Sequence, residues 1–205
     1  MPIPQRKILL AIYLCVLHFA CHIEATPLNP GLAIEEKQNV LEDTPSHCLE
    51  PSINCDDLVS PPSITQNSLC NGGALEPGIY KLNDTLTLNP GACPVLDGQG
   101  ITLIAPEGKR HFNINGSATL QNITLACGQN RDPESAGGSV LASGTSEQNL
   151  TLYNVQFYGN ISYGDGGAMA SDGLNLGSHY SCFDNNKALR GGAVYIENAQ
   201  SAIFE

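Results

Sequence analysis

Short runs of alternating apolar and polar residues occupy the chain from residue 71 to residue 205, and glycine pairs and asparagines separate them. Alternation with a period of two is typical of β-strands with one buried face. Toward the end of the chain the pattern occurs twice with nearly the same residues. The first copy contains Phe157, Asn160, Gly166, Gly167 and Ala168, and the second contains Phe183, Asn186, Gly191, Gly192 and Ala193.

The spacing between the two copies predicts a stacked architecture. The equivalent phenylalanines and the equivalent asparagines are 26 residues apart, and the glycine pairs are 25 residues apart. A repeat of this length indicates supersecondary units that stack on one another. Three short strands fit one lap (one full turn) of a parallel β-helix, with neighbouring laps about 4.8 Å apart. We therefore expect Phe183 to stack on Phe157 and Asn186 on Asn160, as scaffold residues.

Weaker copies precede these two. Residues 118–125 match residues 150–157, and the run 137–140 occupies the slot of the glycine pair. Earlier strand candidates are 78–82, 85–88, 94–98, 101–104 and 111–114. The glycine pairs let the backbone turn sharply and approach the next lap where a Cβ atom would clash. The fold class predicted for residues 71–205 is all-β, a parallel β-helix of roughly five laps.

The first 70 residues differ in character. Residues 1–25 have the parts of a secretory signal peptide: Arg6 and Lys7, an apolar run over 8–20, and small residues near Ala25. No later segment is apolar enough to cross a membrane, so we expect no membrane span in the mature chain. Residues 26–70 are rich in proline and contain cysteines. They are either a linker or an N-terminal cap that covers the first lap.

Six cysteines remain after removal of the signal peptide: Cys48, Cys55, Cys70, Cys93, Cys127 and Cys182. An even number in a secreted chain predicts disulfides, and their pairing stays open apart from a local Cys48–Cys55 bridge that proximity favours. A metal site is not expected, because no close Cys-x-x-Cys pair exists and the histidines are scattered. The formal net charge of −11 argues against a nucleic-acid partner.

The two repeated motifs also carry a resemblance. Phe-x-x-Asn at 157–160 and 183–186, with Gly-Gly-Ala at 166–168 and 191–193, resembles the repeat of the chlamydial polymorphic outer membrane proteins. A looser similarity to pectin-lyase-like β-helices, in 96–103 and 122–125, extends to residue 71. The resemblance implies a right-handed β-helix outside the cell that serves in adhesion.

In that family a further C-terminal domain exports the β-helix and anchors it in the outer membrane. This chain ends within an expected strand at 203–205. We therefore expect a C-terminally truncated β-helix, either a short product or the N-terminal fragment of a longer autotransporter-like surface protein. Location at a bacterial outer membrane is expected only for the longer protein. Similar repeats also occur in predicted surface proteins of eukaryotic microbes.

Catalytic chemistry would need clustered carboxylates with a base. The candidates are Asp165, Asp172 and Asp184, with Lys187 and Arg190 nearby in sequence. In the repeat register Asp165 and Arg190 occupy equivalent positions, which predicts a surface ion pair. His179 lies alone at a polar strand position. We therefore predict no catalytic, metal-binding or cofactor-binding residue.

Five Asn-x-Ser/Thr sequons are candidate glycosylation sites: Asn83, Asn115, Asn122, Asn149 and Asn160. Asn160 is also the repeat asparagine, and an inward-facing side chain cannot carry a glycan. The leading functional hypothesis is a secreted or cell-surface, non-enzymatic β-helix for adhesion or recognition of an extracellular protein or glycan. The alternative is a carbohydrate-active β-helix enzyme, either a polysaccharide lyase or a glycoside hydrolase.

Overall fold

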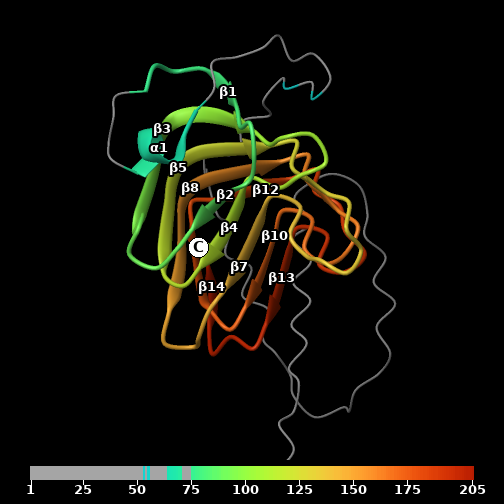
Figure 1. The fold of residues 1–205 in the computed structure, drawn as a ribbon. Helices are drawn as coiled ribbons and strands as arrows, with labels where there is room; N and C mark the ends of the chain where they lie inside the picture. The colour runs from blue at the N-terminus through green and yellow to red at the C-terminus, as the bar shows by residue number, and fades with distance from the viewer. Residues whose placement is uncertain (1–52, 54, 56–63, 71–74) are drawn as a thin grey trace, which may run out of the picture. The chain divides into compact units, whose positions relative to one another are not determined.

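A computed structural model describes residues 53, 55, 64–70 and 75–205. The predicted signal peptide, Cys48 and most of the lead-in (residues 26–70, the predicted linker or cap) lie outside these residues. The described chain forms a parallel β-solenoid of about five laps, and the ribbon in Figure 1 passes from β1 through the stack to β13 and β14. The predicted fold class is confirmed, and α1 is the one helix of the described residues.

The elements follow the chain in this order: α1 (Gln66–Cys70), β1 (Ile79–Lys81), β2 (Leu86–Leu88), β3 (Val95–Ile104), β4 (Phe112–Asn115), β5 (Ala118–Ala126), β6 (Gln129–Asn130), β7 (Val140–Ser143), β8 (Asn149–Tyr158), β9 (Ile161–Ser162), β10 (Met169–Asp172), β11 (Asn175–His179), β12 (Cys182–Asp184), β13 (Val194–Glu197) and β14 (Ala202–Phe204).

These strands form three parallel sheets that run along the stack. The long sheet has the order β1-β3-β5-β8-β11-β14, and β12 also pairs with β8. The second sheet has the order β13-β10-β7-β4-β2, and a small sheet pairs β6 with β9. Each strand therefore pairs with its counterpart one lap away, as a solenoid requires.

The register of the strands confirms the repeat alignment. Leu125 pairs with Phe157 in the long sheet, and Phe157 pairs in turn with Phe183. In the second sheet Met169 pairs with Val140 on one side and Val194 on the other. Equivalent residues of the sequence repeats therefore lie above one another in space.

One difference concerns the strands near residue 99. The separate strands predicted over 94–98 and 101–104 form the single strand β3, with an irregularity in its pairing between Asp97 and Ile101. Gln99 has a φ of 53°, and Asn122 and Asn154 have a φ of 52° within β5 and β8. One such residue in β5 and in β8, and the pair Gln99 and Gly100 in β3, bend these strands without ending them. Asparagine adopts this conformation more readily than most residues.

Apolar side chains fill the interior in columns. Phe157 is fully buried, and its ring stacks on that of Phe183 with centroids 4.9 Å apart and planes inclined by 4°. The predicted phenylalanine stack is therefore confirmed. An aromatic pair of this kind stabilises a fold by about 0.5–1.5 kcal/mol beyond the burial of its area. Most other core residues are leucine, isoleucine, valine or alanine, and Phe112 and Met169 are the larger exceptions.

The glycine pairs sit where the chain enters the second sheet. Gly166 and Gly191 have positive φ values of 65° and 57°. The amide of Gly167 donates to the Gly191 carbonyl of the next lap. A Cβ atom on Gly167 would lie 2.6 Å from the amide nitrogen of Lys187 and still closer to the Gly192 carbonyl oxygen. The expected close approach is confirmed, since backbone atoms occupy the space of a side chain.

Two disulfides join described residues, Cys55–Cys127 and Cys70–Cys93, and Cys182 is disulfide-bonded as well. The predicted Cys48–Cys55 bridge is wrong, because Cys55 bonds a cysteine 72 positions later in the chain. Ile53 and Cys55 pack against Ile104 and Cys127, so packing across the lap sets this pairing. Disulfides form in oxidising compartments, which indicates an extracytoplasmic location.

The described part of the lead-in is folded against the stack. Thr65 directly precedes α1, and its carbonyl and hydroxyl oxygens both accept a hydrogen bond from the Ser68 amide. Leu69 is buried in the main core, and α1 contacts β3. The prediction of a linker or cap over residues 26–70 did not include this short helix, because five residues are too few to show a helical period.

Substitution of Gly167 tests the close approach between laps. Gly167→Ala should lower the free energy of unfolding of the 205-residue chain by about 2–4 kcal/mol, because backbone atoms of the next lap cannot move aside. The matched control is Gly192→Ala, whose Cβ atom would have no neighbour nearer than 3.9 Å. Urea unfolding of both variants checks the prediction, and equal effects would contradict it.

Candidate functional site

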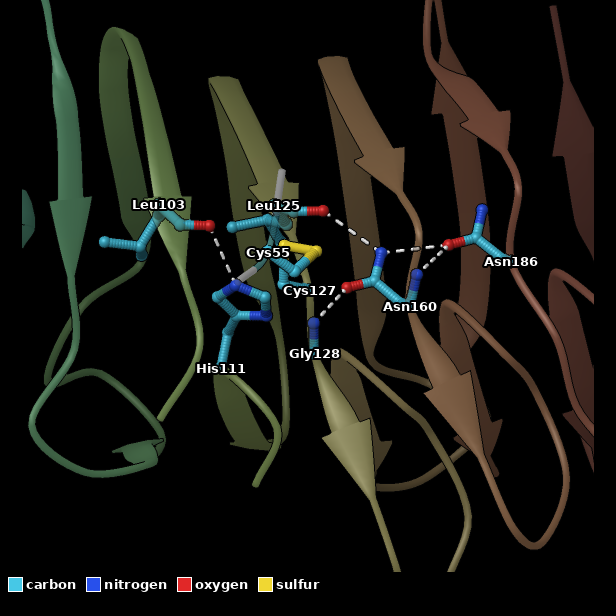
Figure 2. Close-up of a disulfide and its surroundings, with 8 residues drawn as sticks. All are labelled: Cys55, Leu103, His111, Leu125, Cys127, Gly128, Asn160 and Asn186. Atoms are coloured by element: carbon cyan, nitrogen blue, oxygen red, sulfur yellow. Dashed lines mark hydrogen bonds between the residues drawn. A yellow bond between two sulfur atoms is a disulfide. The ribbon is translucent and has the colours of Figure 1, made fainter. Parts of the chain in front are cut away.

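The repeat asparagines, of which Asn160 is fully buried and Asn186 half-buried, form an amide ladder that is shown in Figure 2. Asn160 Nδ2 donates to Asn186 Oδ1 at 2.9 Å and to the Leu125 carbonyl at 3.1 Å, while its Oδ1 accepts from the Gly128 amide at 2.8 Å. Asn186 Nδ2 donates in turn to the Phe157 carbonyl at 3.1 Å. These bonds join three successive laps. The predicted stacking of Asn186 on Asn160 is therefore confirmed, with a structural role for both residues.

A second ladder follows the bends of the long sheet on the outside. Asn154 Nδ2 donates to Asn122 Oδ1 at 3.0 Å, and Asn122 Nδ2 donates to Asp97 Oδ1 at 3.3 Å. Burial raises the pKa of Asp97, but hydrogen bonds from Gln121, the Gln99 amide and Asn122 outweigh it, so the pKa is lowered overall. Sequence reasoning missed this ladder. Its signal was the asparagine in the same slot of two aligned copies.

The five sequon asparagines have different surroundings. Asn160 is fully buried, and Asn122 belongs to the outer ladder. Asn115 is exposed, but its Nδ2 donates to Asn89 Oδ1 at 3.0 Å. Asn83 and Asn149 are exposed, and the side chain of neither forms a hydrogen bond with a described residue. These two amides are therefore the ones that a glycan could modify without breaking a contact.

His111 is a fully buried polar residue that the sequence analysis treated only as part of a strand. Its Nε2 lies 2.9 Å from the Leu103 carbonyl oxygen (Figure 2), and its Nδ1 lies 2.9 Å from the Ser139 hydroxyl. A neutral ring with its proton on Nε2 satisfies both contacts. Burial lowers the pKa of His111 to about 4, against bonds to Leu103 and Ala126 that raise it. The histidine is thus a neutral core residue.

The candidate catalytic aspartates lie at three different places around the lap. Asp165 precedes the glycine pair, Asp172 ends β10, and Asp184 ends β12. Arg190 Nε donates to Asp165 Oδ1 at 2.8 Å, which confirms the predicted neighbours. The other two aspartates accept from asparagines: Asp172 from Asn198 and Asp184 from Asn185.

His179 lies apart from these aspartates, with its Nδ1 2.9 Å from Glu205 Oε2. Lys187 is exposed. In the parts of the chain that the structure describes, no group of three histidine, cysteine, aspartate or glutamate side chains could hold a metal ion. Likewise, none of the described helices is long and apolar enough to span a membrane.

A groove of about 470 Å³ lies over the second sheet. Thr87, Asn113 and Leu141 form its floor and follow one another in register on β2, β4 and β7. The complete lining is Thr85, Thr87, Gly108, Lys109, Arg110, Asn113, Asn115, Asn130, Ser135, Leu141 and Ser143. This surface is concave and mostly polar, and three laps contribute to it. It is the candidate binding site, and the sequence analysis named only Asn115 among its residues.

Comparison with known proteins does not identify a family for this chain. No family model, curated protein or solved structure matches the chain. The β-solenoid therefore stands on the structure itself, and the likeness of the repeat to a particular family stays a prediction. Any functional inference must come from the groove and its neighbouring side chains.

The burial of His111 predicts a pH dependence of stability. His111 binds a proton near pH 6.5 in the unfolded chain but only near pH 4 in the folded chain. Its contribution to the free energy of unfolding is therefore fully present above pH 6.5 and is lost as the pH falls toward 4. The loss should be about 3 kcal/mol in the free energy of unfolding. His111→Gln should remove this contribution to the slope of the free energy of unfolding against pH. The control His179→Gln should keep it.

Urea unfolding between pH 4 and pH 7 measures these slopes. Titration of the histidine resonances by NMR gives the pKa of His111 in the unaltered protein, so the test does not depend on folding of the variant. A His111 resonance that titrates near pH 6.5 would contradict the assignment.

The sequon geometry predicts which asparagines carry glycans when the chain is secreted from a eukaryotic host. Asn83 and Asn149 should be modified, whereas Asn160 should not, because its amide is enclosed by the ladder. Glycopeptide mapping of the folded, secreted protein measures the occupancy. The double variant Asn83→Gln with Asn149→Gln should lose the corresponding mass. A glycan on Asn160 would contradict the buried ladder.

Proposed function

We propose that the chain is a secreted or surface-exposed, non-enzymatic β-helix that recognises an extracellular ligand through the groove on its second sheet. The observation that carries the proposal is the groove itself, whose floor residues Thr87, Asn113 and Leu141 are aligned by strand pairing on three laps. Ligand sites are commonly pre-formed concave surfaces with a few well-placed polar groups. Here the rigid stack fixes the spacing of those groups.

The stacked motifs support the finer part of the proposal, a surface protein with repeats of the polymorphic outer membrane protein type. Phe157 stacks on Phe183 and Asn160 bonds Asn186, which gives the Phe-x-x-Asn motif a physical reason to recur. The oxidising compartment indicated by the disulfides agrees with a location outside the cell.

The non-enzymatic part of the proposal rests on the side chains near the groove. None of the described residues that line it has a carboxylate, and Asp165 is held by Arg190 outside that lining. Hydrolysis of glycosides usually needs two carboxyl groups that flank the scissile bond. Binding without turnover is the function that this arrangement supports best.

Blocking the groove tests the proposal. Purified chain applied to a glycan array and to immobilised extracellular matrix proteins should show saturable binding. Thr87→Tyr, at an exposed groove position, should reduce that binding at least tenfold, because the ring fills the floor. The control Thr145→Tyr alters an exposed threonine outside the groove and should bind as the unaltered chain does.

The same samples are assayed for new reducing ends and unsaturated products on uronic-acid polymers. Turnover that disappears in Asp165→Asn or Asp184→Asn would overturn the non-enzymatic proposal. Binding that is equal in Thr87→Tyr and the unaltered chain would remove the groove from the function.

A further inference from the structure

Arg110 is a buried, charged residue in the lining of the groove. Its side chain lines the groove although the residue is only 9% exposed. Nη1 donates to Asn113 Oδ1 at 3.4 Å, and Nη2 donates to Ser135 Oγ at 2.6 Å. Both acceptors are neutral, and a guanidinium carries more donors than these two bonds use. Arg110 therefore keeps hydrogen-bonding capacity at the groove.

The charge of Arg110 has no direct counter-ion in the part of the chain that the structure describes. Burial lowers the pKa of Arg110, and the more distant Asp132 carboxylate raises it. A buried charge is costly unless an opposite charge accompanies it. A bound anion would supply that charge.

The rest of the lining narrows the class of ligand. Lys109 adds a second cation, whose Nζ lies 2.7 Å from Asp84 Oδ1 outside the lining. The other side chains are hydroxyls and amides, apart from Leu141. Hydroxyl and amide groups can form hydrogen bonds with the hydroxyls of a sugar. A single apolar residue provides few contacts for the apolar side chains of a peptide.

The longer third lap builds one wall of this site. Asn130 and Gly137 are seven positions apart, against four for their counterparts Ser162 and Gly166 in the next lap. The additional residues extend the loop that carries Ser135, the closer acceptor of Arg110. Ser135 is itself held by Asn130, whose Nδ2 donates to the Ser135 carbonyl at 2.9 Å. The loop thus has a defined position beside the guanidinium.

We propose that the groove binds an acidic sugar chain and that Arg110 receives its carboxylate or sulfate group. The floor residues Thr87 and Asn113 then face the sugar hydroxyls, and Lys109 adds attraction at the rim. This inference rests on the proposed recognition function and specifies its ligand. Charge-assisted bonds to a guanidinium are short and strong, and its paired N–H groups fit two oxygens of either group.

Calorimetric titration with four short probes tests the proposal: a tetragalacturonate, a chondroitin sulfate tetrasaccharide, a neutral maltotetraose and a tetraglutamate peptide. The two acidic sugars should bind at least tenfold more tightly than the other two, and less tightly as salt is added. Arg110→Gln should weaken acidic-sugar binding about tenfold or more. The control Lys187→Gln removes an exposed positive charge outside the groove and should have no effect.

Arg110→Lys and the groove-blocking Thr87→Tyr provide the second readout, so the test survives if Arg110→Gln does not fold. Arg110→Lys keeps the charge and should recover part of the affinity. Equal binding of maltotetraose, or tetraglutamate binding as tight as that of the acidic sugars, would overturn the ligand class. If Thr87→Tyr abolishes array binding while the Arg110 variants bind normally, recognition through the groove stands and the role of Arg110 is wrong.

Discussion

Backbone pairing between successive laps is the constraint on which the rest of this structure depends. Parallel strands about 4.8 Å apart place every residue above its counterpart, so a favourable side chain at one level becomes favourable again at the next. Phe157 over Phe183 and Asn160 over Asn186 are the result. The same constraint leaves no room for a side chain at Gly167, where the backbone of the next lap occupies the space. Repetition in the sequence is therefore a requirement of geometry.

The corner where each lap leaves the long sheet shows how polar groups are kept inside such a stack. His111, the Cys55–Cys127 disulfide, Asn160 and Asn186 lie in one row across neighbouring strands (Figure 2). The polar members of this row each have partners within 3.1 Å. Leaving a buried polar group without a partner costs more free energy than a hydrogen bond to that group contributes on balance. The repeat asparagines and the buried histidine are therefore structural residues. The polar residues that line the groove lie outside the repeated motifs.

Much of the fold could be predicted because local pattern and global architecture agree. The match of residues 118–125 to 150–157 is the observed pairing of β5 with β8. The partner of Cys55 could not be predicted, since closeness along the chain says little about closeness across a lap. The groove was also missed. Arg110 and Ser135 are 25 positions apart and belong to no motif, so only folding reveals that they share a surface.

The unequal length of the laps separates two tasks within one chain. Asn122 and Asn154 are 32 positions apart, whereas Asn160 and Asn186 are 26 apart, yet the strands of both laps remain in register. The additional residues lie in connections outside the paired strands, so they leave the interior unchanged. A lineage could lengthen or shorten such a connection and acquire a new selectivity without having to redesign its core. The core of the stack therefore restricts which residues fit, whereas the connections between strands tolerate changes of length.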